Sequence, residues 1–203
     1  MKMSVKLLLI RHGQIRANVA GRWHGATDSP LTAIGKRQAE RVARRVGQFF
    51  PHVRAIYTSP LQRCLNTAQA ISDATGEPVQ IIDDLREYGI GELENTRFKS
   101  LAEKHDFFRR THSDHDFAPR GGDSLNAVAE RIVAALQHIH AAHDDAEHVA
   151  IVSHGAAMGV AMASLLDGDP AGWTNYTVSN CSITEFSLSP EPLVEAFNRV
   201  EHL

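Results

Sequence analysis

The sequence predicts an α/β protein with three layers (α/β/α), in which a mostly parallel central sheet lies between two layers of helices. Short apolar runs of strand length alternate with longer segments whose apolar residues recur at helical spacing, the pattern of parallel strands joined by helical crossovers. A polar stretch at about residues 95–121 follows one strand and precedes a long helix. We expect it to form a small helical cap insertion, packed onto the core through Phe107 and Phe108.

Each predicted element has a local signal in the sequence. The strands are short apolar runs, expected at 5–10, 55–58, 79–85 and 148–152, with one or two late strands at 182–188 and 193–197. The helices carry apolar residues three and four positions apart, and they are expected at 32–50, 61–75, 124–143 and 156–166. Pro51 ends the first helix, Gly76 and Pro78 end the second, and Asp123 or Ser124 can cap the third.

The composition is that of an ordinary globular protein, and it excludes several classes. Of the 203 residues, 43% are hydrophobic and 22% charged, which is enough to build a core, and we expect a single domain over residues 1–203. A net charge of −3 argues against a general nucleic-acid binder, which would carry a basic surplus. The apolar run at 7–10 is too short for a signal peptide, and no run approaches the roughly 20 residues that cross a bilayer. We therefore expect a cytoplasmic protein that binds neither nucleic acid nor a membrane, with a homo-oligomer left open.

The cysteines and histidines show no convincing metal-ligand pattern. Cys64 and Cys181 are too few for a disulfide framework, and their spacing is not that of metal ligands. Histidines gather with aspartates at 112–116 and at 138–144, where the second group ends in Asp144. Both groups are interpreted as solvated polar segments, so no metal site is expected.

Charged side chains follow four of the predicted strands at the point where each strand ends. They are Arg11 and His12 after the first strand, Arg63 shortly after the second, Arg86 and Glu87 after the third, and His154 after the fourth. Because the carboxyl ends of parallel strands meet at one edge of a sheet, we expect these side chains to converge there. Each motif taken alone is weak, since a histidine after a strand is more often structural than catalytic. The joint placement favours a functional site.

Such a group of side chains suits phosphoryl transfer. Guanidinium groups bind phosphoryl oxygens in pairs and stabilise the charge that develops on them. A neutral imidazole can attack phosphorus and form a covalent intermediate. The carboxyl group of Glu87 can protonate the leaving oxygen, and a dianionic substrate would favour its protonated form through like-charge repulsion.

Ordered segments over most of the chain resemble the histidine phosphatase superfamily, also called the phosphoglycerate mutase-like family. They are LLLIRHGQIRAN, WHGATDSPLTAIGKRQA, YTSPLQRCLNTA, LREYGIGELEN, GGDSL and VSHGA. The resemblance implies that His12 is the phosphorylated nucleophile and that Glu87 is the proton donor to the leaving group. It also implies a set of residues that bind the phosphoryl group, namely Arg11, Asn18, Arg63 and His154, and a loop at the pocket entrance with His24 and Gly25.

The chain departs from the family pattern at positions outside this expected site. Ile15 stands where the family usually has Thr, Leu93 where it has Trp, Asn95 where it has Gly, and Asp123 where it has Glu. These positions bear on the choice of substrate. The family chemistry needs no metal, and its phosphatases need no organic cofactor, so the expected partner is a small-molecule phosphate ester.

The favoured function is hydrolysis of phosphate monoesters by an enzyme of the histidine acid phosphatase type. A cofactor-dependent phosphoglycerate mutase is the alternative, and the compact segment between Glu87 and Gly121 argues against it, because mutases of the family usually carry a longer insertion there. A non-catalytic module that binds a phosphorylated ligand is a third hypothesis. It is disfavoured because both His12 and Glu87 are present.

Overall fold

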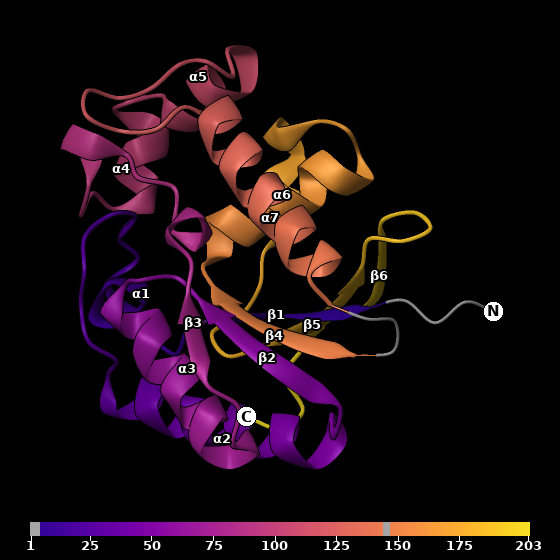
Figure 1. Cartoon of the computed structure of the whole chain (residues 1–203). Coiled ribbons are helices and arrows are strands. Elements are labelled where there is room, and N and C mark those ends of the chain that lie inside the picture. The colour runs from indigo at the N-terminus through magenta and orange to yellow at the C-terminus, as the bar shows by residue number, and fades with distance from the viewer. Residues whose placement is uncertain (1–4, 144–146) are drawn as a thin grey trace.

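The computed structural model describes residues 5–143 and 147–203 and confirms the three-layer α/β/α architecture (Figure 1). Within these residues the sheet has the strand order β3-β2-β4-β1-β5-β6. The strands are β1 (Lys6–Arg11), β2 (Val53–Thr58), β3 (Val79–Ile81), β4 (His148–Ser153), β5 (Ile183–Ser187) and β6 (Leu193–Arg199). The pairs among β1 to β4 are parallel, whereas β5 runs antiparallel to β1 and to β6. The sheet is therefore mostly parallel, as predicted.

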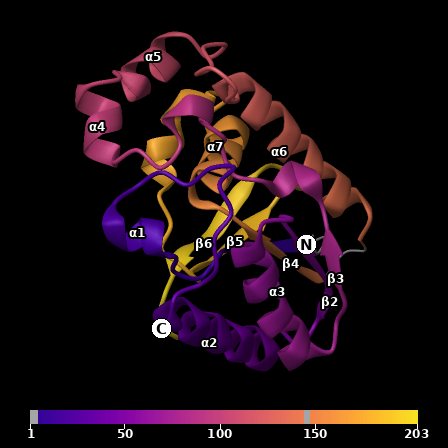
Figure 2. The ribbon, with the colours of Figure 1, turned by 90° about the vertical axis from the view of Figure 1, so that its left-hand side faces the viewer.

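Helices cover both faces of this sheet. The α-helices are α1 (Arg16–Ala20), α2 (Ala33–Phe49), α3 (Gln62–Thr75), α4 (Phe98–Glu103), α5 (Phe107–Ser113), α6 (Leu125–Ala141) and α7 (Gly155–Leu166), and the 3-10 helices are η1 (Asp83–Leu85), η2 (Gly91–Leu93) and η3 (Pro170–Tyr176). Helices α2 and α3 lie on one face, and α6 and α7 lie on the other (Figures 1 and 2). No helix in the described residues is long and apolar enough to span a membrane.

Strand β1 shows why a continuous apolar run forms the centre of this fold. Successive side chains of a strand point to opposite faces. Leu8 and Ile10 join the core cluster under α2 and α3, while Leu7 and Leu9 join the cluster under α6 and α7. All four are at most 2% exposed. Burial of each such side chain contributes roughly 1.5–3 kcal/mol, so the run is stable only between two layers of helices.

The long helices begin where the sequence predicts. The Thr32 hydroxyl accepts a hydrogen bond from Gly35 N at 3.0 Å and caps α2. The Ser124 hydroxyl accepts from Ala127 N at 3.2 Å and caps α6. These caps satisfy N–H groups that the first turn of a helix leaves without a partner.

The third predicted strand, 79–85, is wrong in its second half. Strand β3 ends at Ile81, which pairs with Thr58, the last residue of β2. Beyond that point no neighbouring strand is left to pair with, and the chain turns inward through η1. Leu85 is fully buried, and its carbonyl accepts a hydrogen bond from the Ser153 hydroxyl at 2.8 Å. This turn carries the chain across the end of β4 toward α7.

The expected cap at 95–121 is helical, with α4 and α5 above the carboxyl ends of the strands (Figure 1). Phe107 is fully buried and packs against Trp23 and Tyr88, with ring centroids 5.7 and 5.8 Å apart. Phe108 is partly buried against the same core. The cap is therefore attached to the core through aromatic packing, as predicted.

Helix α1 and element η3 were not predicted. Helix α1 has only five residues, too few for an apolar period to show. Element η3 begins with Pro170, and the Asp169 carboxylate accepts a hydrogen bond from Ala171 N at 2.9 Å. Both elements lie beside the cavity described below.

The backbone of the loop after β1 crosses the start of α2 at very close range. A Cβ atom on Gly35 would lie 2.1 Å from Gln14 O, and one on Gly13 would lie 2.5 Å from Gly35 O. Only glycine fits at either position, because both neighbours are backbone atoms that cannot swing away.

Substituting Gly35→Ala should therefore lower the free energy of unfolding by about 2 kcal/mol, because the loop that carries His12 must move. The matched control is Gly172→Ala, where the nearest atom to the new Cβ is a side-chain oxygen 3.5 Å away. Urea denaturation of both variants checks this. Equal stabilities would show that the crossing is not tight.

Candidate active site

The pairing of β1 with β4 brings two histidines together. Arg11 lies opposite Ser153 in the ladder, so His12 and His154 follow neighbouring parallel strands. His12 N donates to Ser153 O at 3.0 Å, and the two imidazole rings lie edge to face with centroids 5.3 Å apart. The expected convergence at the carboxyl edge is therefore present for these side chains.

His12 is held in one tautomer by the backbone next to it. Its Nδ1 lies 2.7 Å from Gly13 O, and a carbonyl can only accept, so Nδ1 carries the proton and Nε2 keeps its lone pair. Burial, followed by the charges of Arg11 and Arg63, lowers the pKa of His12 well below its ordinary value. The imidazole is therefore neutral near pH 7, with a nucleophilic nitrogen on the side away from Gly13.

His154 is fully buried behind His12, and both of its ring nitrogens bond to the protein. Its Nδ1 accepts from Arg63 Nε at 3.2 Å, which leaves the proton on Nε2, 2.8 Å from the Ser59 hydroxyl. Burial and the charge of Arg63 lower the pKa of His154 well below its ordinary value. A neutral ring can lie this close to a guanidinium, whereas an imidazolium would be repelled.

Arg63 is also fully buried, and a loop wraps around it. Its Nη1 donates to Thr27 O at 2.8 Å, and its Nη2 donates to His24 O at 3.1 Å and to Gly25 O at 2.8 Å. With the bond from Nε to His154, four of the five N–H donors of this guanidinium are used, and one on Nη1 remains.

The other side of this loop is held by Glu94, a residue that sequence reasoning missed. Its carboxylate collects five donors, namely Gly25 N at 2.9 Å, Ala26 N at 3.2 Å, Thr27 N at 3.3 Å, Thr27 Oγ1 at 2.7 Å and Ile90 N at 3.0 Å. A Cβ on Gly25 would lie 2.2 Å from Tyr88 O, so only glycine fits there. The motif LREYGIGELEN contains Glu94, but nothing in a sequence shows where a carboxylate points.

Arg11 faces the cavity from the end of β1. Its Nη1 donates to Val178 O at 2.6 Å, and its guanidinium lies over Gly155, where a Cβ would come within 3.3 Å. Burial lowers the pKa of Arg11. Its Nε is buried without a hydrogen-bond partner, so this side chain has donor capacity that the described residues do not use.

Glu87 lies at the N-terminus of α7. Its carboxylate accepts from Ala156 N at 3.1 Å, Ala157 N at 2.7 Å and Tyr88 N at 2.9 Å. The first N–H groups of a helix have no partner within the helix, so this position suits a carboxylate. Arg86, expected at the same edge, instead pairs with Asp83 at 2.9 Å on the surface and does not line the cavity.

Asn18 comes from α1. Its Oδ1 accepts from Ile15 N at 3.0 Å and from Asn180 Nδ2 at 3.2 Å. Since the oxygen is used in this way, the NH₂ group is the end that can donate to a ligand.

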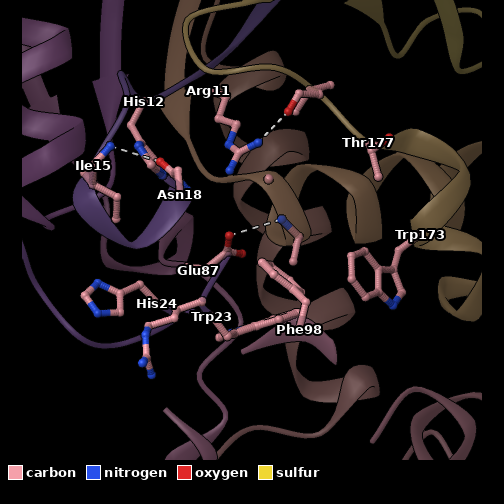
Figure 3. Close-up of a pocket in the computed structure, with 14 residues that line it drawn as sticks. Arg11, His12, Ile15, Asn18, Trp23, His24, Glu87, Phe98, Trp173 and Thr177 are labelled. Atoms are coloured by element: carbon pink, nitrogen blue, oxygen red, sulfur yellow. Dashed lines mark hydrogen bonds between the residues drawn. The ribbon is translucent and has the colours of Figure 1, made fainter. Parts of the chain in front are cut away.

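These side chains surround a cavity of about 140 Å³ (Figure 3). Five of the predicted site residues line it, namely Arg11, His12, Asn18, His24 and Glu87. Three do not, namely Gly25, Arg63 and His154, which lie behind the lining. The other walls include aromatic side chains outside the catalytic motifs.

Cys64 is a packing residue. It is fully buried, with Sγ 3.4 Å from His154 Nε2, and burial raises the pKa of its thiol. Across the described residues, no group of three or more His, Cys, Asp or Glu side chains is placed to hold a metal ion. Asp144, the last member of one histidine group, lies outside the described residues.

The architecture and the cavity define an α/β protein with an anion-attracting site built around a buried neutral imidazole. A model of the histidine phosphatase superfamily (branch 1) matches residues 7–198. Curated relatives named probable phosphoglycerate mutase GpmB are 30% identical in Enterobacter sp. (strain 638), over 98% of this chain and 95% of the relative. The relative of the same name from Yersinia enterocolitica is 33% identical, over 93% of this chain and 87% of the relative.

Solved structures agree with this match. Phosphoserine phosphatase from Entamoeba histolytica, in complex with 3-phosphoglyceric acid, is 29% identical with a TM-score of 0.85, over 98% of this chain and 99% of that one. Mycobacterial glucosyl-3-phosphoglycerate phosphatase, in complex with VO₃, is 27% identical with a TM-score of 0.84, over 96% and 99%. The chain belongs to the histidine phosphatase superfamily.

The lowered pKa of His12 should appear in the pH dependence of stability. The unfolded chain takes up a proton on this imidazole near pH 6.5, while the folded protein does so only at lower pH. The free energy of unfolding should therefore fall as the pH falls from 7.5 to 5.5. In the His12→Asn variant, the free energy of unfolding should fall by about 1 kcal/mol less over this pH range than in the unsubstituted protein. Urea denaturation at a series of pH values measures it, and parallel curves would contradict a neutral buried His12.

Removing the Glu94 carboxylate should leave buried N–H groups without partners. Glu94→Ala should lower the free energy of unfolding by about 2 kcal/mol, whereas Glu103→Ala, an exposed glutamate in α4, should change it by less than about 0.5 kcal/mol. Thermal and urea denaturation of both variants check this, and similar stabilities would mean that Glu94 does not hold the loop.

Proposed function

We propose that the protein is a phosphomonoester hydrolase of the histidine acid phosphatase type, acting on small-molecule phosphate esters through a phosphohistidine on His12. The observation that carries the proposal is the neutral, tautomer-locked imidazole at the wall of a cavity beside Arg11 and Glu87. Membership of the superfamily and the phosphatases among the similar solved structures support it.

In the first step, His12 Nε2 attacks phosphorus and a P–N bond forms as the ester P–O bond breaks. The electron pair of that bond goes to the leaving oxygen, which takes the proton of the Glu87 carboxyl group and departs as an alcohol. Arg11 and the NH₂ group of Asn18 bind the non-bridging oxygens, where charge develops, and the buried guanidinium of Arg63 adds positive charge from behind the lining. Gly13 O, which accepts from Nδ1–H, stabilises the positive charge on the phosphorylated ring.

In the second step, water attacks phosphorus and the P–N bond breaks. Glu87, now a carboxylate, takes a proton from the water, and His12 returns to its neutral form. The products are inorganic phosphate and the regenerated site. His154 does not touch the cavity and acts as a positioning residue, since it fixes Arg63 and packs against the ring of His12.

His12→Ala should abolish phosphate release from a simple ester such as 4-nitrophenyl phosphate. The exposed His112→Ala variant is the matched control and should keep full activity. Rapid quenching of the unsubstituted protein should trap an acid-labile phosphoprotein, and NMR should place the phosphorus on Nε2. Phosphate release that survives in His12→Ala would overturn the proposal. It would indicate an enzyme with a different nucleophile, because a non-catalytic binding module would release no phosphate.

Glu87→Gln should separate leaving groups by their need for a proton. We expect kcat/KM to fall by about 100-fold to 10,000-fold for alkyl phosphates, whose leaving oxygen must be protonated. The loss should be much smaller for 4-nitrophenyl phosphate, because 4-nitrophenolate leaves readily without a proton. Steady-state kinetics with both esters measures the split. An equal loss for both would remove Glu87 as the proton donor.

A phosphoglycerate mutase is the second candidate, because curated relatives carry that name. A mutase needs a bisphosphorylated primer and returns the phosphoryl group to a monophosphate acceptor, whereas a hydrolase passes it to water. Incubation with 3-phosphoglycerate, with and without primer, distinguishes them. Isomer formation that depends on primer would favour the mutase, and inorganic phosphate without primer would favour the hydrolase.

A further inference from the structure

The cavity has two chemically different sides, with Glu87 between them. Figure 3 shows Arg11 and His12 above Glu87, with the aromatic side chains Trp23 and Phe98 below it and Trp173 to its right. With a phosphoryl group against His12 and its bridging oxygen at Glu87, the rest of the ester extends toward the aromatic side. The leaving group is therefore the part of the substrate that these three side chains contact.

The aromatic side chains form one continuous surface, which we call the aromatic wall (Trp23, Phe98 and Trp173). The ring centroid of Trp23 lies 5.6 Å from that of Phe98 and 5.9 Å from that of Trp173. Trp23 Nε1 already donates to Tyr88 O at 2.9 Å, so its indole offers a ligand no hydrogen bond. Phe98 is 45% exposed, and a ligand that covers it would remove apolar surface from water.

Most of the remaining lining is apolar or neutral, and its polar members are Arg22, His24 and the hydroxyl of Thr177. Ile15, Ala156 and Val178 add apolar surface. His24 is kept neutral near pH 7, because burial and the charge of Arg63 lower its pKa. Arg22 is the one further guanidinium in the lining, and its Nη1 already donates to Asn95 O at 2.6 Å.

Building on the proposed function, we propose that the preferred substrates are phosphate monoesters whose alcohol carries an apolar, flat group next to the phosphate. Phosphorylated hydroxy acids, which place a carboxylate there, are poor substrates. Aromatic pairs favour edge-to-face and offset contacts at 4.5–7 Å, so a ring on the leaving group can extend the wall.

The test compares primary alkyl phosphates, because their leaving groups have similar basicity and differences in rate then report on contacts. The panel is ethyl, hexyl and benzyl phosphate, with glycerol phosphate and 3-phosphoglycerate as polar and anionic members. We expect kcat/KM for benzyl phosphate to exceed that for glycerol phosphate and for 3-phosphoglycerate by at least about tenfold, the scale of one apolar contact.

Variants assign this preference to the wall. Phe98→Ala should lower the ratio of kcat/KM for benzyl to ethyl phosphate by about tenfold, and Phe98→Leu should restore part of it. The matched control is Phe197→Ala in β6, at a phenylalanine that is 40% exposed and does not line the cavity, and it should leave the ratio unchanged. Circular dichroism and the Tm confirm that each variant folds.

The outcomes separate this proposal from the proposed function. If the unsubstituted protein releases no phosphate from any ester, or if His12→Ala releases as much, the hydrolase proposal fails. If phosphate is released and 3-phosphoglycerate is the best substrate, with that preference lost in Arg22→Gln, the hydrolase stands and the apolar leaving group is overturned. Equal rates over the whole panel, unchanged by Phe98→Ala, overturn it as well.

Discussion

The buried guanidinium of Arg63 is the interaction on which the site depends. A fully buried charge is costly unless most of its donors find acceptors. Here the acceptors are His154 Nδ1 and the carbonyls of the loop at residues 24–27. The carboxylate of Glu94 accepts hydrogen bonds from the N–H groups of the same loop. One cation thus fixes the tautomer of His154 and the path of the loop, and its charge also helps to keep His12 neutral.

The rest of the site follows from two neighbouring strands and one helix. Strands β1 and β4 place the histidines side by side, and the start of α7 supplies backbone N–H groups to Glu87. These are backbone features, so the positions of the reacting groups depend little on the rotamers of long side chains. The nucleophile and the carboxyl group are therefore held in place before any ligand arrives, which is what electrostatic preorganisation requires.

Sequence reasoning predicted the parts of the fold that have a strong period or a clear cap. The buried run of β1, Ser124 as one of the two expected caps of α6, and the cap insertion with Phe107 are of this kind. It was wrong about the end of β3, because the length of an edge strand depends on its partner. It missed Glu94 and Trp173, since their roles come from contacts between distant segments.

The aromatic wall is built from three separate places in the chain: the loop after α1, the start of α4 and the turn η3. None of these belongs to the strand ends that carry the imidazoles and the carboxyl group. Substitutions on the wall can accumulate without disturbing bond making and breaking, so proteins that evolve from this fold can acquire new substrates while their chemistry stays the same.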